Sequence, residues 1–126
     1  MIPIMRAQGG GTILNISSGT ALMNLPGMSP YSSSKRALAG ISLAAREELQ
    51  ADNIVVSVVY PYITLTGFEK NTIRAVPVPE DEREPTGPYP PDSAEFVAGK
   101  IAGGIVSGEA EVFFHDWMKE RHTGLT

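Results

Sequence analysis

The chain has 126 residues, a net charge of −4 at neutral pH, a pI near 5.1 and no cysteine. A chain of this length forms at most one domain, its acidic balance offers no basic surface to nucleic acid, and the lack of cysteine excludes disulfides and thiolate metal sites. The first residues lack a signal peptide's apolar core and no stretch reaches membrane-spanning length, so we expect a cytoplasmic protein without membrane partners.

The first two expected elements are a helix end and a strand. Residues 1–8 have the composition of a helix end, and the three glycines at 9–11 are expected to stop it. Those glycines precede a strand instead of joining a strand to a helix, which argues against a phosphate-binding loop. Residues 12–16 are a short apolar run typical of a buried strand. Ser17 and Ser18 follow at its carboxyl end, where doubly wound sheets bind ligands, and we take Ser18 as the candidate site residue with Ser17 as the near alternative.

A long helix is predicted after a loop at residues 19–30. Ser29 and Pro30 are a favourable helix start, and the helix is expected to run to about residue 51. The apolar residues of the loop either line a pocket or pack against a neighbouring helix. Helical spacing assigns the core face of the helix to Leu38, Ile41, Ala45 and Leu49.

Tyr31 and Lys35 lie one turn apart on this helix. An exposed tyrosine has a pKa of about 10, and a nearby cation lowers it by favouring the phenolate. The pair is therefore a candidate general acid and base. Taken alone, such a pair more often belongs to a solvated helix face. The preceding strand, which ends in a serine, favours the catalytic interpretation here.

The second half of the chain continues the alternation of strands and helices. Residues 54–60 are apolar and rich in β-branched side chains, as in a strand buried within a parallel sheet, so the fold class is predicted as α/β. Residues 67–91 are irregular and rich in proline and acidic residues, which is typical of a lid or a solvated segment. A helix capped by Asp92 and Ser93 should then run to residue 107, with Ile101 and Ile105 on its apolar face.

A short last strand is expected at residues 111–114. His115 and His122 have no cysteine or carboxylate at ligand spacing, so no metal site is predicted. Trp117 is interpreted as a packing residue.

Taken together, these motifs resemble one family. The segments Thr12-Ile-Leu-Asn-Ile-Ser-Ser18, Ser33-Ser-Lys35 with Tyr31 before it, and Val58-Val-Tyr-Pro61 are similar in order and spacing to those of the short-chain dehydrogenases/reductases. The resemblance covers nearly the whole chain but only the second half of the family's fold. It implies a single truncated domain, a partial Rossmann-like doubly wound parallel sheet of roughly three strands with flanking helices.

The resemblance implies hydride transfer between NAD or NADP and an alcohol or carbonyl substrate. Tyr31 would exchange a proton with the substrate oxygen, Lys35 would lower the tyrosine pKa and bind the cofactor ribose, and Ser18 would donate to the carbonyl. The same resemblance makes residues 67–91 a substrate lid. It also makes the helix over residues 31–51, which is rich in small side chains, a surface for homo-oligomer formation.

A second cofactor contact is implied at the turn after residue 60. Besides Tyr31 and Lys35, the positions that match the family's nicotinamide-binding turn are Pro61, Thr64 and Thr66. Tyr62 stands where the family usually has glycine. If this position needs a positive φ, tyrosine is strained there; otherwise its ring can extend into the substrate pocket.

The resemblance also implies elements upstream of the first strand that these residues do not include, among them the glycine-rich nucleotide loop. We therefore expect the chain to retain its catalytic residues but to bind NAD(P) weakly or not at all when alone. One alternative is a non-catalytic fragment that pairs with a full-length relative. Another is a serine hydrolase using Ser18, His115 and Asp92, for which the Gly-x-Ser-x-Gly motif is absent.

Overall fold

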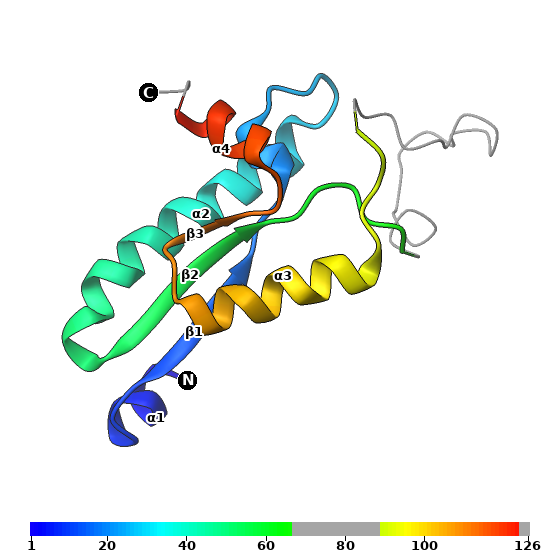
Figure 1. The fold of residues 1–126 in the computed structure, drawn as a ribbon. Coiled ribbons are helices and arrows are strands. Elements are labelled where there is room, and N and C mark those ends of the chain that lie inside the picture. Colours follow the sequence, from blue (N-terminus) through cyan, green and yellow to red (C-terminus); the bar gives the residue numbers. More distant parts are fainter. Residues whose placement is uncertain (67–88, 124–126) are drawn as a thin grey trace.

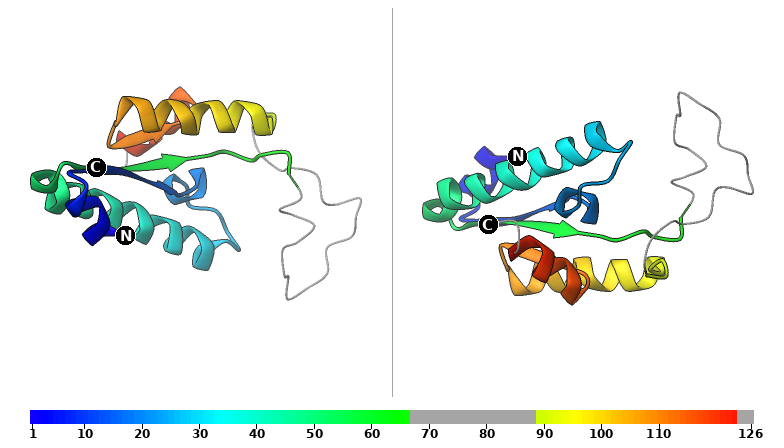
Figure 2. Two further views of the ribbon diagram at one scale, coloured as in Figure 1. Left: turned by 90° about the horizontal axis from the view of Figure 1, so that it is seen from below. Right: turned by 90° about the horizontal axis from the view of Figure 1, so that it is seen from above.

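The computed structural model describes residues 1–66 and 89–123. Three parallel strands form its sheet in the order β1-β2-β3, with a helix on either face (Figures 1 and 2). Helix α2 covers one face and α3 the other, which confirms the predicted partial doubly wound α/β fold. The elements are α1 (Ile2–Ala7), β1 (Gly11–Ile16), a 3₁₀ turn (Gly19–Leu22), α2 (Ser29–Leu49), a second 3₁₀ turn (Gln50–Asp52), β2 (Ile54–Tyr60), α3 (Ala94–Ser107), β3 (Glu111–Phe113) and α4 (Asp116–Thr123).

Glycine is required where α1 gives way to β1. Gly9 and Gly10 have φ values of 87° and 142°, which other residues rarely adopt. A Cβ on Gly10 would lie 2.5 Å from the carbonyl oxygen of Asn53. The Gly11 N–H donates to that same oxygen at 3.2 Å. The glycines thus stop the helix, as predicted, and allow the starts of β1 and β2 to approach closely.

Strand β2 forms the centre of the sheet and of the core. Its residues Val58, Val59 and Tyr60 are at most 1% exposed. The parallel register runs from Gly11 opposite Ile54 to Ile16 opposite Val59, so both strands end at the same edge of the sheet. This edge is where the residues with predicted chemistry gather.

The predicted core face of α2 is wrong at Ile41, which is 65% exposed. Polar contacts set the rotation of the helix instead. The Ser42 hydroxyl accepts a hydrogen bond from Asn15 of β1 at 2.9 Å, and the Arg46 guanidinium donates to the Val56 carbonyl at 2.7 Å. The buried residues of α2 are Ser32, Ala39, Ser42 and Leu49.

A similar correction applies to α3. Ile105 is 50% exposed, whereas Gly104 is buried against Val112 and Leu14. The glycine lets the helix approach the sheet closely, and the isoleucine beside it is turned away from the core. Hydrophobicity alone did not identify the packed face.

The predicted lid falls mostly on residues 67–88, outside the described residues. The two described flanks of that segment are paired with each other. The Leu65 N–H donates to the Asp92 carbonyl at 3.0 Å, and the Asp92 N–H donates to the Ile63 carbonyl at 2.7 Å, as an isolated parallel bridge. Within the described ranges, no helix has both the length and the apolarity needed to span a membrane.

Candidate active site

Tyr31 and Lys35 lie in the first turns of α2, beside the end of β1. The Lys35 ammonium is 5.7 Å from the centroid of the Tyr31 ring. It also donates a hydrogen bond to the Ile16 carbonyl at 3.0 Å. The lysine therefore reaches from the helix to the carboxyl end of the strand and keeps a positive charge beside the phenol.

The two serines after β1 have different surroundings. Ser17 is 3% exposed, and its hydroxyl donates to the Lys35 carbonyl at 2.9 Å, which ties the end of β1 to α2. Ser18 is half-buried, and its hydroxyl accepts hydrogen bonds from the Thr20 N–H at 3.2 Å and hydroxyl at 3.1 Å. Among the described residues, no hydrogen bond joins Ser18 to Tyr31. Ser17 thus has a structural partner, and Ser18 is the more accessible of the two.

The turn after β2 lies against the turn after β1. The Gly19 N–H donates to the Pro61 carbonyl at 2.7 Å, which places Pro61 next to Ser18. The Thr64 hydroxyl donates to the Tyr62 carbonyl at 3.1 Å. Thr66 is exposed at the end of the described segment. The sheet therefore brings the first residues of the predicted nicotinamide-binding turn close to the predicted catalytic serine.

Tyr62 occupies its position without a strained backbone. Asn53 is the single non-glycine residue with a positive φ in the described ranges, so the first of the two possibilities for Tyr62 is wrong. The Tyr62 ring makes edge contacts with Trp117, His115 and Tyr89, at centroid distances of 5.4, 6.0 and 6.4 Å. Its hydroxyl is buried and has no hydrogen-bond partner in the described part of the chain.

These contacts belong to an aromatic cluster that sequence reasoning did not identify. Trp117 stacks on Tyr89 at 5.1 Å, and His115 stacks on Phe96 at 5.6 Å. Trp117 packs, as predicted, but against rings that are distant in the sequence. A local pattern does not show which loops meet, and the one available signal was the density of aromatic residues near the ends of β2 and β3. The aromatic cluster consists of Tyr62, Tyr89, Phe96, His115 and Trp117.

His115 forms an ion pair with Asp92 if its imidazole is protonated. Its Nε2 lies 2.9 and 3.0 Å from the two carboxylate oxygens, and the Asp92 side chain is 9% exposed. These are two of the three residues considered for a serine hydrolase. In the described ranges the Ser18 hydroxyl accepts hydrogen bonds from Thr20 and has none with His115, so the serine and histidine are not joined as such a mechanism needs.

A second histidine pair lies between β3 and α4. His122 Nε2 is 3.3 Å from the Glu111 carboxylate, which also accepts a 2.6 Å hydrogen bond from the buried Tyr60 hydroxyl. Burial raises the pKa of Tyr60 well above its usual range, and the hydrogen bond to Glu111 and its negative charge raise it further. In the described residues, no three histidine, aspartate or glutamate side chains gather as metal ligands would.

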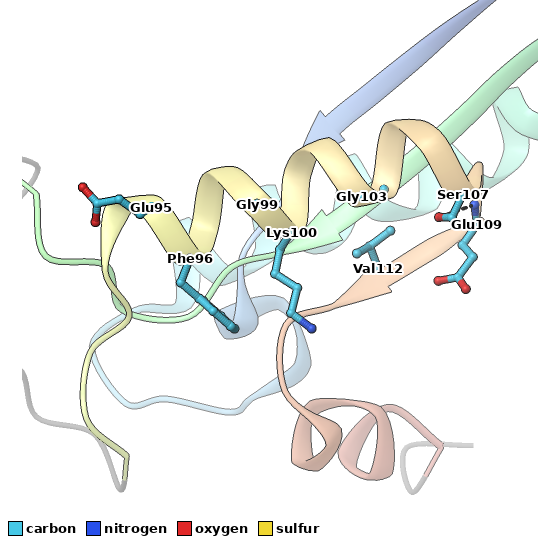
Figure 3. Close-up of a pocket in the computed structure, with 9 residues that line it drawn as sticks. Glu95, Phe96, Gly99, Lys100, Gly103, Ser107, Glu109 and Val112 are labelled. Carbon is cyan, nitrogen blue, oxygen red and sulfur yellow. Dashed lines mark hydrogen bonds between the residues drawn. The ribbon is translucent and has the colours of Figure 1, made fainter.

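A shallow groove of about 450 Å³ lies between α3 and β3 (Figure 3). Phe96 and Lys100 project from α3, and Val112 of β3 lies further along the groove below Gly103. None of the predicted catalytic or cofactor residues lines this groove. The groove has a glycine-rich wall and is separate from the candidate site at the ends of β1 and β2.

Comparison with known proteins identifies the family. A family model described as short chain dehydrogenase matches residues 1–76. A 3-ketodihydrosphingosine reductase from Dictyostelium discoideum is 34% identical over an alignment of 117 residues, and the match covers 90% of this chain and 34% of the relative. A 3alpha-hydroxysteroid dehydrogenase from Mediterraneibacter gnavus is 35% identical over 111 residues, covering 78% of this chain and 44% of that protein.

The solved structures agree. A short chain dehydrogenase from Burkholderia cenocepacia in complex with NADP is 25% identical, with a TM-score of 0.75 over 98% of this chain and 47% of that one. The chain therefore spans between a third and a half of the length of these relatives. By its sequence and its fold, the chain belongs to the short-chain dehydrogenase/reductase family.

Proposed function

We propose that this chain carries the proton-transfer residues of an NAD- or NADP-dependent oxidoreductase that acts on a small alcohol or carbonyl substrate in the cytoplasm. The observation that carries the proposal is the contact of Tyr31 with Lys35 at the carboxyl end of β1. Family membership and the NADP complex of a structural relative support it.

The residues present fit part of a nicotinamide cofactor. The Lys35 ammonium has three N–H donors. In the described residues one of them is used by the Ile16 carbonyl, so the other two are suited to donate to ribose hydroxyls. Pro61 lies beside Ser18, and Thr64 follows in the same turn with its hydroxyl bonded to the Tyr62 carbonyl, so a carboxamide bound there would meet backbone and hydroxyl groups. Together with Tyr31 and Thr66, they form the proposed cofactor contacts. The nicotinamide ring would supply or accept the hydride.

The proposed chemistry of the chain's own residues is a proton transfer. Tyr31 gives its phenolic proton to the substrate oxygen during reduction and takes it back during oxidation. Lys35 stabilises the phenolate that remains, because its positive charge stands one helical turn away. Ser18 donates its hydroxyl hydrogen bond to the carbonyl oxygen as negative charge develops there.

Carbonyl-dependent oxidation of NADPH or NADH by the purified chain, at millimolar cofactor concentration, tests this proposal. We expect slow turnover that falls by at least about a hundredfold in Tyr31→Phe, the usual contribution of a general acid. Tyr89→Phe removes an exposed phenol that has no role in the proposed proton transfer and is the matched control. Equal turnover by Tyr31→Phe and the parent chain would end the proposal.

The second candidate is a non-catalytic fragment that pairs with a full-length relative. An exposed stripe on α2 favours a partner of some kind, since Ile41 is 65% exposed and a Cβ on Gly40 would meet open space. The same stripe supports the proposed homo-oligomer. Complete lack of turnover, together with co-purification of this chain with a full-length relative, would favour this candidate, whereas a monomeric mass in light scattering would count against the homo-oligomer.

A further inference from the structure

Asp92 links two parts of the chain through its backbone and its side chain. Its backbone N–H and carbonyl pair with Ile63 and Leu65, so it holds the turn that follows β2. Its carboxylate accepts from His115 Nε2 at 2.9 and 3.0 Å. One residue therefore joins the turn at residues 63–65 to the segment that follows β3.

His115 is itself fixed on several sides. Its carbonyl accepts from the Met118 N–H at 3.0 Å, at the start of α4. Its ring stacks on those of Phe96 and Trp117, at centroid distances of 5.6 and 6.3 Å. Because the ring is held by neighbours from α3 and α4, its Nε2 presents a fixed donor to Asp92.

The same contacts continue to the predicted catalytic serine. Met118 is fully buried, and its terminal carbon lies 2.8 Å from where a Cβ on Gly19 would stand. Gly19 follows Ser18 and donates to the Pro61 carbonyl. A continuous path of contacts thus runs from the turn at residues 63–65 through Asp92 and His115 to the turn that carries Ser18.

We propose that Asp92 and His115 form a clasp that positions the turn at residues 63–65 against the Ser18 turn. Both act as positioning residues, through the backbone of the turn and not on substrate. Asp92 lies on one flank of residues 67–88 and pairs with the other flank, and His115 holds Asp92 in place. The value of the clasp to catalysis rests on the proposed function, because the clasped turn contains Thr64, a proposed cofactor contact.

Residue-specific amide hydrogen exchange of the 126-residue chain, measured without cofactor, tests the clasp. In His115→Ala we expect the Leu65 and Asp92 amides to exchange at least about tenfold faster, because a charge-assisted hydrogen bond restrains them. His115→Gln, which keeps a side-chain N–H donor, should restore part of the protection. His122→Ala removes the other paired histidine and serves as the matched control.

Amides of the β1–β2 ladder separate positioning from general destabilisation. They should keep their protection in His115→Ala, since the ladder does not depend on the clasp. Unchanged exchange at Leu65 and Asp92 would overturn the proposal, and so would equal acceleration across the ladder. If His115→Ala does not fold, Asp92→Asn makes the same comparison, because it removes the carboxylate charge and keeps the backbone groups that form the bridge. Because the measurement needs no turnover, its failure is distinguishable from failure of the proposed function.

Discussion

Polar side chains fix the ends of the central strand. Near the start of β2, Arg46 donates to the Val56 carbonyl at 2.7 Å and to the Gly108 carbonyl at 2.8 Å. At its end, the buried Tyr60 hydroxyl donates to Glu111 on the neighbouring strand at 2.6 Å. Buried polar groups of this kind are costly unless paired, so each specifies one arrangement of its elements.

The Tyr60 phenol should make the fold sensitive to alkali. Its pKa is raised in the folded chain by burial and by Glu111, whereas in the unfolded chain it titrates near its ordinary value of about 10. Above that pH the unfolded state loses a proton that the folded state keeps, so stability is full below about pH 10 and falls as pH rises further.

Tyr60→Phe should remove this alkaline loss. The variant should be less stable at pH 8 by about 1.5–3 kcal/mol, the usual contribution of a hydrogen bond to a charged group. Its free energy of unfolding should then change less than the parent's between pH 9 and about 11. Urea unfolding at a series of pH values checks this. If the free energies of unfolding of the two proteins fell equally with rising pH, the Tyr60 phenol would not be the cause of the alkaline loss of stability.

At the level of elements, the sequence predicted the order and type of the helices and strands from α1 to β3, but not helix α4 or the rotation of the helices. Periodicity placed Ile41 in the core of α2, where the Asn15–Ser42 hydrogen bond instead turns another face inward. The Tyr31–Lys35 spacing was readable because one helical turn fixes it. The aromatic cluster was not, because its members meet only through tertiary contacts.

Helix α3 offers a test of close packing with adjacent glycines. A Cβ on Gly104 would lie 3.0 Å from Val112 and 3.2 Å from Leu14, whereas one on Gly103 would meet nothing within 4 Å. Gly103→Ala should therefore stabilise the chain by about 0.5–1 kcal/mol through helix propensity. Gly104→Ala should be less stable than Gly103→Ala by about 1 kcal/mol or more, because overpacking against Val112 and Leu14 offsets the gain in helix propensity.

Thermal and urea unfolding of the two alanine variants compares them directly. Both substitutions make the same chemical change one residue apart, so each serves as the control for the other. Equal stabilities would mean that α3 can shift away from the sheet at no cost, and that its close approach does not specify the position of β3.

Across the described part of the molecule, the proposed proton-transfer residues lie together at the end of β1, but the proposed contacts to a dinucleotide are few. The described sheet ends at β1, and the proposed cofactor residues all serve the nicotinamide end. In doubly wound folds, the pyrophosphate binds at a glycine-rich turn between a strand and a helix, which residues 1–66 and 89–123 do not form.

Isothermal titration of the purified chain with NAD, NADH, NADP and NADPH measures the consequence. We expect dissociation constants above about 1 mM, which correspond to a binding free energy weaker than about −4 kcal/mol. Lys35→Met should abolish even this binding if the ribose contact is correct. Micromolar affinity of the 126 residues alone would contradict the expectation.

The bridge between Thr64 and Asp92 has a consequence for how such a protein can diversify. The hydrogen bonds among Ile63, Leu65 and Asp92 join the turn after β2 to the residues before α3 and fix the position of these two segments relative to each other. Replacement or shortening of residues 67–88 should then leave the described strands and helices in place, so that this segment can change in sequence and length while the scaffold is retained.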